Sequence, residues 1–231
     1  MRVLAIETAT QQASVALIGD GGAVIASRAD RVTTHSERLL PLLGELLAEA
    51  GVELAALDAI ACGAGPGSFT GLRIGLATAK GLCLGAGLPL LLVSSLEALA
   101  WRAPAGAVAV ACIDAFKCEV YAGVFARGAG GELSAIEPEA VLPPERLADR
   151  LRARLAAGGP PLHLIGDGAE RWPALHLAGL VRTDRQPPDA VAVGQLALVR
   201  LLRGERDALG AATPTYIRPS EAELMSDPRP A

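Results

Sequence analysis

The sequence has few of the residues from which metal centres are built, and it has no surplus of positive charge. Its 231 residues include three histidines and four cysteines, with no Cys-x-x-Cys or His-x-x-x-His spacing. Zinc sites use such spacings, so we predict no metal site. The 21 lysines and arginines are outnumbered by 25 aspartates and glutamates, for a net charge of −4. A protein that binds RNA by itself carries a basic face, so any RNA contact should be indirect, through a partner.

The sequence also lacks a long uninterrupted apolar segment. Glu7 breaks the first apolar stretch, which is too short for a secretion signal. Glycines and Lys80 break the longer ones before about 18 residues, the length that spans a membrane. We therefore expect a cytoplasmic protein with no membrane contact. Hydrophobic residues make up 51% of the chain, enough for a substantial core in which the four cysteines stay as buried free thiols.

Apolar segments and turn residues alternate in a pattern that occurs twice, which predicts an α/β fold of two similar βββαβα halves. The first half, residues 1–103, is predicted to hold strands at 3–7, 13–18, 23–28, 57–62 and 89–93. Its three predicted helices are one that follows a Thr34 cap and ends before Gly51, one over 70–85, and one that ends at Trp101. The second half, residues 104–231, is predicted to hold strands at 108–114, 119–127, 133–137 and 161–165 and helices at 144–155 and 190–203. Residues 225–231 are expected to form a loose tail.

The glycine-rich segment 63–75 is the most informative part of the sequence. It joins a buried strand to a helix, and Ser68 is expected to cap that helix. Glycines before a helix can expose amide groups that bind an anion, which makes Gly65, Gly67 and Ser68 candidates for a phosphate or nucleotide site. The segment lacks the Gly-Lys-Ser/Thr ending of a P-loop. A tight structural connection is the alternative, and we favour it.

Two carboxylates follow the leading strands of the two halves. Glu7, with Thr8 after it, ends the first of these strands, and Asp114 ends the other. Ligands of open α/β sheets bind at the carboxyl ends of strands, so Glu7, Thr8 and Asp114 join the candidate nucleotide site. Hydrogen-bonded carboxylates with no ligand are the alternative. No Gly-x-Ser-x-Gly motif or ordered Ser/His/Asp set appears, and we predict no catalytic residue.

Two helices in the first half look suited to a partner. Leucines cover an arc of about 160° on the first helix, wider than the roughly 100° that one core requires. On the second, Gly71, Gly75 and Ala79 recur every four residues, as do Ala77, Gly81 and Gly85. Glycine inside a helix costs about 1 kcal/mol, which close approach of another backbone would offset. The predicted partner interface consists of Leu39, Leu42, Leu43, Leu46, Leu47, Gly71, Leu72, Gly75, Leu76 and Ala79. Packing within the chain is the alternative for both helices.

Several motifs together resemble the bacterial TsaB (YeaZ) family. They are Ile6-Glu7-Thr8-Ala9-Thr10, His35-Ser36-Glu37-Arg38-Leu39-Leu40-Pro41, the string from Gly65 to Gly75, Ser94-Ser95-Leu96-Glu97-Ala98, and Pro214-Thr215-Tyr216-Ile217-Arg218. The similarity covers nearly the whole chain, and Gly-Pro-Gly-Ser-Phe-Thr-Gly-Leu-Arg-Ile-Gly is its most specific part.

This resemblance implies an actin/hexokinase-like (ASKHA) fold and a role in making N6-threonylcarbamoyladenosine at position 37 of tRNAs that read ANN codons. It further implies a non-catalytic scaffold subunit that pairs with the catalytic paralogue TsaD through its two N-terminal helices and also binds the ATPase TsaE. The metal-binding His-x-x-x-His of the paralogue is absent, because Leu39 stands four residues after His35. A homodimer through the same helices would exclude the heterodimer.

Two other functions fit the resemblance less well. An ATPase or kinase of this fold would use glycine near Glu7 and Asp114, where Ala9 and Phe116 stand instead. A peptidase acting on the paralogue would need a catalytic set that the sequence lacks. We expect no cofactor on the chain itself, with ATP at a complex interface as the alternative. Charged or bulky residues at Leu43 or Gly75 are expected to abolish pairing while the monomer stays folded.

Overall fold

Two five-stranded sheets with the same topology form the protein. The computed structural model describes residues 1–32 and 34–218, so the predicted tail at 225–231 lies outside the described residues. The first sheet contains β1 (Val3–Glu7), β2 (Gln12–Ile18), β3 (Val24–Arg31), β4 (Ala59–Gly63) and β5 (Leu90–Val93), in the order β3-β2-β1-β4-β5. The second contains β6 (Val108–Asp114), β7 (Val120–Arg127), β8 (Leu133–Leu142), β9 (Leu162–Ile165) and β10 (Leu180–Asp184), in the order β10-β9-β6-β7-β8.

The order of the second sheet, read in reverse, repeats that of the first. In each sheet the leading strand is central, antiparallel to the next strand along the chain and parallel to the fourth. This confirms the predicted internal repeat, and the second half contains one strand, β10, that was not predicted. Both leading strands are apolar and buried almost throughout, as expected for strands covered on two faces.

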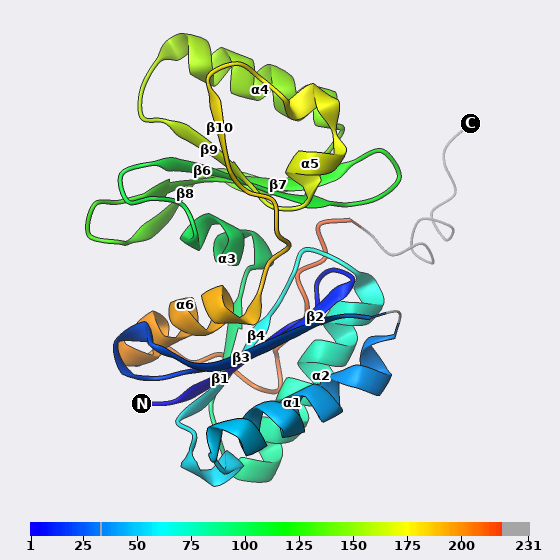
Figure 1. Cartoon of the computed structure of the whole chain (residues 1–231), viewed down its shortest axis with the longest axis vertical. Helices are drawn as coiled ribbons and strands as arrows, with labels where there is room; N and C mark the ends of the chain where they lie inside the picture. Colours follow the sequence, from blue (N-terminus) through cyan, green and yellow to red (C-terminus); the bar gives the residue numbers. More distant parts are fainter. Residues whose placement is uncertain (33, 219–231) are drawn as a thin grey trace.

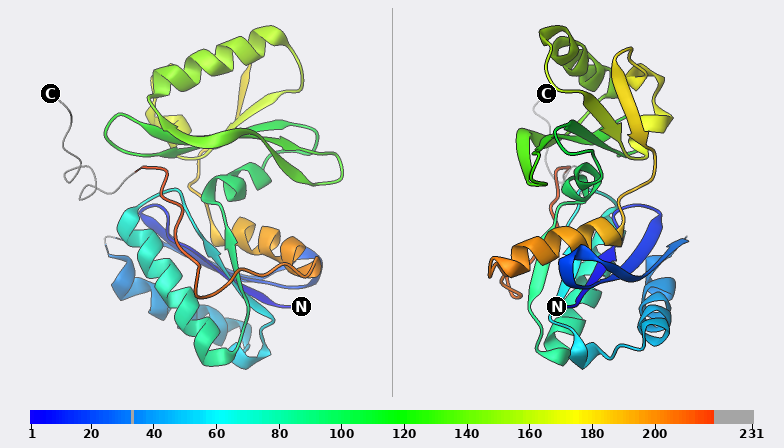
Figure 2. Two further views of the ribbon diagram at one scale, coloured as in Figure 1. Left: turned by 180° about the vertical axis from the view of Figure 1, so that it is seen from behind. Right: turned by 60° about the vertical axis from the view of Figure 1, so that its left-hand side comes forward.

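Helices cover both faces of each sheet (Figures 1 and 2). The helices are α1 (His35–Ala50), α2 (Phe69–Ala86), α3 (Ser95–Trp101), α4 (Pro144–Ala157), α5 (Gly168–Arg171) and α6 (Ala190–Leu202), with short 3-10 turns at Asp20–Gly22, Leu54–Ala56 and Pro173–Leu175. Alternate side chains of β1 point to opposite faces. Leu4 and Ile6 pack with leucines of α1 and α2, whereas Val3 and Ala5 pack with α6.

The boundary predicted between residues 103 and 104 falls between the two sheets, but two helices cross it. Leu96 and Leu99 of α3 pack on the second sheet, with Ile113. Val193 and Leu198 of α6 pack on the first sheet, although α6 lies late in the chain. The division into residues 1–103 and 104–231 therefore needs correction for these helices. Hydrophobic periodicity shows that a helix has a buried face, but it does not show which sheet covers that face.

Two local expectations also need correction. Thr34 occupies the position before α1, but its side chain makes no capping hydrogen bond, so the predicted capping box does not form. Cys118 is exposed, whereas the other three cysteines are buried free thiols. Among the described residues, no helix combines the length and apolar character that crossing a membrane requires.

Candidate functional site

Glu7 lies at the carboxyl end of β1 and is fully buried. Its Oε1 atom accepts a hydrogen bond of 2.7 Å from the Ala9 amide, and its Oε2 atom accepts one of 2.8 Å from the Ser95 hydroxyl. Gly63 runs beside this carboxylate, and a Cβ atom there would lie 2.2 Å from Oε2. Both carboxylate oxygens therefore have hydrogen-bond partners within the chain. This fits the alternative in which Glu7 is a hydrogen-bonded carboxylate of the fold.

Burial raises the pKa of Glu7 from 4.5 to about 6, against the opposing effect of hydrogen bonds from Ala9 and Ser95. Between these two values the folded chain holds more protons than the unfolded chain, so stability falls as pH rises from about 4.5 to 6. The rise corresponds to roughly 2 kcal/mol. The free energy of unfolding of Glu7→Gln minus that of the wild type should therefore be about 2 kcal/mol larger at pH 8 than at pH 4.5. Urea unfolding across this range measures the difference; a difference that does not change with pH would contradict the prediction.

The glycine-rich segment packs tightly against the residues that follow β1. A Cβ atom would lie 2.3 Å from the Ala9 carbonyl oxygen at Gly67, 2.2 Å from the Thr8 carbonyl oxygen at Gly71, and 2.2 Å from Thr8 Oγ1 at Gly75. The Thr8 hydroxyl donates a hydrogen bond of 2.9 Å to the Gly71 carbonyl. Close backbone approach within the chain thus accounts for these glycines, as the alternative of a tight connection predicted.

Ser68 caps α2 as predicted, because its hydroxyl accepts a hydrogen bond of 3.3 Å from the Gly71 amide. Its own amide donates to the Ala9 carbonyl at 2.7 Å. Gly65 has a φ of +98°, a conformation that side chains rarely adopt. Six residues were proposed for a nucleotide site. Among them, Thr8 and Ser68 both hydrogen-bond to Gly71, and Glu7 directly precedes Thr8.

Asp114 belongs to a separate network in the second half. Its carboxylate accepts a hydrogen bond of 3.3 Å from the Phe116 amide and pairs with Arg171 at 2.6 Å. The Asp114 amide donates to Asp167 at 3.4 Å, and burial raises the pKa of Asp167 to about 6. Sequence reasoning missed Asp167 and Arg171, although the Gly-Asp-Gly that follows β9 is a detectable signal. Glu7 and Asp114 thus each have partners of their own.

Most of the predicted interface residues face the interior of the chain. Those with buried side chains or backbone are Leu39, Leu42, Leu43, Leu46, Gly71, Leu72, Gly75, Leu76 and Ala79, and Leu47 is half-buried. On α1 these leucines pack on β1, β2 and α2, which together cover the wide apolar arc. The assignment of these side chains to a partner surface is therefore corrected, because their contacts lie within the chain.

Comparisons with known proteins agree with this architecture. The family model described as TsaD, tRNA N6-adenosine threonylcarbamoyltransferase, matches residues 2–166. The tRNA threonylcarbamoyladenosine biosynthesis protein TsaB of Escherichia coli (strain K12) is 38% identical over 94% of this chain and 95% of its own length. The TsaB protein of Haemophilus influenzae is 34% identical, with 94% of each chain covered. The chain belongs to the TsaB family.

Solved structures confirm both the family and the fold. YeaZ from Pseudomonas aeruginosa is 35% identical and covers 93% of this chain and 99% of its own, with a TM-score of 0.78. The ROK hexokinase from Thermus thermophilus, 14% identical, covers 89% of this chain and its whole own length with a TM-score of 0.52, and this likeness concerns the fold alone. The TsaB-family chain therefore has the predicted actin/hexokinase-like fold.

The outer surface of α1 and α2 in this TsaB-family chain consists of other residues than those predicted. Leu40 on α1 is 59% exposed, and Leu84 on α2 is 73% exposed. A Cβ atom added at Gly44, Gly81 or Gly85 would have no atom within 4 Å among residues 1–32 and 34–218. Of the two rows of small residues on α2, the row Gly71, Gly75, Ala79 thus faces inward and the row Ala77, Gly81, Gly85 faces outward. We call the exposed surface of α2 formed by Ala77, Gly81, Leu84 and Gly85 the outer face.

A C-terminal strap, residues 212–218, joins the two halves of the TsaB-family chain (Figures 1 and 2). The Thr215 amide donates to the Ala64 carbonyl at 2.7 Å in the first half. The Arg218 guanidinium donates to the Ala115 carbonyl at 2.9 Å and pairs with Glu119 in the second half. The strap therefore contacts the start of the glycine-rich segment at Ala64 and the turn after β6 at Ala115 and Glu119.

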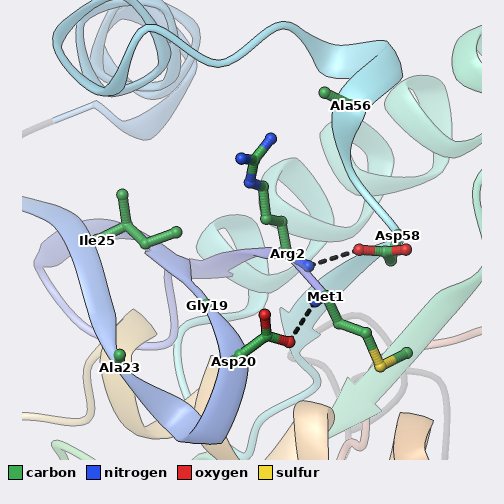
Figure 3. A pocket seen from close by; sticks show the side chains of 8 residues that line it. All are labelled: Met1, Arg2, Gly19, Asp20, Ala23, Ile25, Ala56 and Asp58. Carbon is green, nitrogen blue, oxygen red and sulfur yellow. Dashed lines mark hydrogen bonds and ion pairs between the residues drawn. The ribbon is translucent and has the colours of Figure 1, made fainter.

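A separate pocket of about 560 Å³ lies at the amino-terminal edge of the first sheet (Figure 3). There the amino group of Met1 pairs with Asp20, and the Arg2 amide donates to Asp58 at 2.6 Å. Ligands of such sheets bind at the carboxyl ends of the parallel strands, which is the opposite end. The pocket contains none of the predicted site residues, and we assign it no function.

Proposed function

We propose that this chain is the non-catalytic subunit required to make N6-threonylcarbamoyladenosine at position 37 of tRNAs that read ANN codons. In this role it acts in the cytoplasm, binds a TsaD-like catalytic paralogue and a TsaE-like ATPase, and contacts tRNA only through the complex. The names of its E. coli and H. influenzae relatives support the pathway, since both match almost over their full lengths.

The observation that carries the scaffold role is the difference between the two rows of α2. Gly71 and Gly75 are required by contacts with Thr8, whereas a Cβ atom added at Gly81 or Gly85 would meet none of the described residues within 4 Å. Each glycine inside a helix costs about 1 kcal/mol relative to alanine, and no contact among the described residues offsets this cost at Gly81 or Gly85. A helix of a partner that lies against the outer face would offset it, because small residues allow close approach. A homodimer formed through the same face would compete with this complex.

The ATPase or kinase alternative gains no support from a specific contact. Such an enzyme would need a carboxylate free to approach a nucleotide, but both oxygens of Glu7 accept hydrogen bonds from Ala9 and Ser95. The Asp114 carboxylate is paired with Arg171. Contacts within the chain hold both residues in place, so neither carboxylate is free to approach a nucleotide.

Reconstitution tests the proposal directly. Labelled threonine, ATP, bicarbonate and substrate tRNA are incubated with the donor-making enzyme, the TsaD-like paralogue and the TsaE-like ATPase, with and without this chain. We expect label in tRNA only when the chain is present. We also expect none when the chain replaces the paralogue, because this subunit supplies binding and not chemistry. Equal incorporation without the chain would overturn the proposal, and ATP turnover by the chain alone would favour the ATPase.

A further inference from the structure

A groove of about 320 Å³ lies between α2 and the C-terminal strap. One wall comes from α2 and the other from the strap, so the groove joins segments far apart in the sequence. Apolar atoms dominate its lining, to which Leu76, Ala77, Ala212 and Pro214 contribute, and Arg73 and Lys80 add positive charge. Ala77 belongs to both the groove and the outer face, so the two surfaces are continuous.

Arg73 and Lys80 are the only charged residues among the 18 of α2. Within the described part of the chain, neither lies within ion-pair distance of a carboxylate, whereas Arg38 and Arg102 each pair with two. Arg73 is nevertheless held in place. Its guanidinium lies 3.8 Å from the centre of the Phe69 ring, and its Nε donates to the Tyr216 hydroxyl at 3.0 Å. The described part of the chain thus presents these two cations beside an apolar surface without an ion pair to either of them.

We infer that this groove binds an acidic helix of a partner protein, with two carboxylates about two turns apart that pair with Arg73 and Lys80. The inference rests on the proposed function, in which the partner is the TsaD-like paralogue. Seven residues separate the two cations, or about 10 Å along the axis of α2, which is also the distance between side chains two turns apart on a facing helix. The open glycines beside Ala77 allow that helix to come close.

The lining favours a protein over a nucleic acid. Proteins that bind nucleic acids use many cations, typically with six to ten phosphate contacts, and this groove offers two. One side of the Tyr216 ring is already taken by Phe69, whose ring centre is 4.9 Å away. Charges at the rim of a protein interface act mainly on the association rate and on its salt dependence. Ion pairs between the two cations and an acidic partner helix would therefore make the outer face selective for that partner.

Association kinetics with the purified TsaD-like paralogue test the inference. We expect Lys80→Glu to lower the association rate about tenfold at low ionic strength, with the deficit shrinking as salt is added. Lys80→Arg should associate like the wild type. Arg146→Glu is the matched control, because Arg146 is exposed on α4 in the other half and should not affect the rate.

The possible failures are distinguishable. If Lys80→Glu associates at the wild-type rate while the wild type pairs with the paralogue, the inference is overturned and the proposed function stands. If the wild type does not pair at all, both are overturned. A labelled single-stranded RNA provides a further arm: binding that Lys80→Glu abolishes, with pairing unchanged, would replace the acidic helix by a nucleic acid.

Discussion

Replacing Gly71 by alanine is expected to lower the free energy of unfolding by about 2 kcal/mol or more, whereas the same change at Gly81 should raise it by about 1 kcal/mol. The two glycines lie in the same helix, ten residues apart. A new Cβ atom at Gly71 would lie 2.2 Å from the carbonyl oxygen of Thr8, and at Gly81 it would meet nothing within 4 Å in the part of the chain that the structure describes. The two substitutions therefore have opposite signs for a chemically identical change.

The size of the loss at Gly71 follows from what the methyl group meets. The Thr8 carbonyl is backbone immediately after the central strand of the first sheet, so it cannot rotate away as a flexible side chain could. Overpacking typically costs about 1–3 kcal/mol, and alanine recovers about 1 kcal/mol of helix propensity. The separation is well below van der Waals contact, so we place the clash at the upper end or beyond.

Urea unfolding of the two variants and the wild type, monitored by circular dichroism, measures these differences. Gly85→Ala serves as a second control for the open row, since nothing lies within 4 Å of its added Cβ atom. Equal stability changes at Gly71 and Gly81 would mean that the inward and outward rows of α2 are wrongly distinguished. The outer face would then have no basis.

How much of this arrangement the sequence predicts depends on what each segment contacts. The bounds of β1 and β6 were predicted to the residue, because both are continuous apolar runs buried on two faces. Strand β10 was missed, since Leu180–Asp184 lies at a sheet edge with mostly exposed side chains and has no buried run. Periodicity thus finds central strands more readily than edges.

The candidate site shows the same limit. Spacing of four residues reveals both small-residue rows of α2, but it does not show which row faces β1. That depends on the contacts of Thr8 with Gly71 and Gly75, more than 60 residues away along the chain. The contact between Arg73 and Tyr216 spans 143 residues and leaves no local pattern. Packing partners distant in the sequence therefore decided what the motifs alone left open.

The outer face leads to the second large effect, on partner binding. Leu84→Asp is expected to weaken pairing with the TsaD-like paralogue at least about thirtyfold, equivalent to roughly 2 kcal/mol, while the monomer stays folded. Leu84 is 73% exposed in the isolated chain, so a charge there stays hydrated until a partner covers it. Covering this carboxylate with an apolar partner surface then carries a desolvation cost that an ion pair with Lys80, one turn away, offsets only in part.

Two controls separate this effect from simple loss of stability. Leu202 at the end of α6 is 66% exposed on the opposite side of the first sheet, so Leu202→Asp should leave pairing unchanged. Leu43 is only 4% exposed and belongs to the core between α1 and the sheet, so Leu43→Asp should unfold the chain. This reverses the expectation that Leu43 or Gly75 could be replaced without harm to the monomer. Calorimetric titration with the paralogue and thermal unfolding of each variant measure both properties. If Leu84→Asp pairs as tightly as the wild type, the partner must bind elsewhere, because no outer-face contact could tolerate that buried charge.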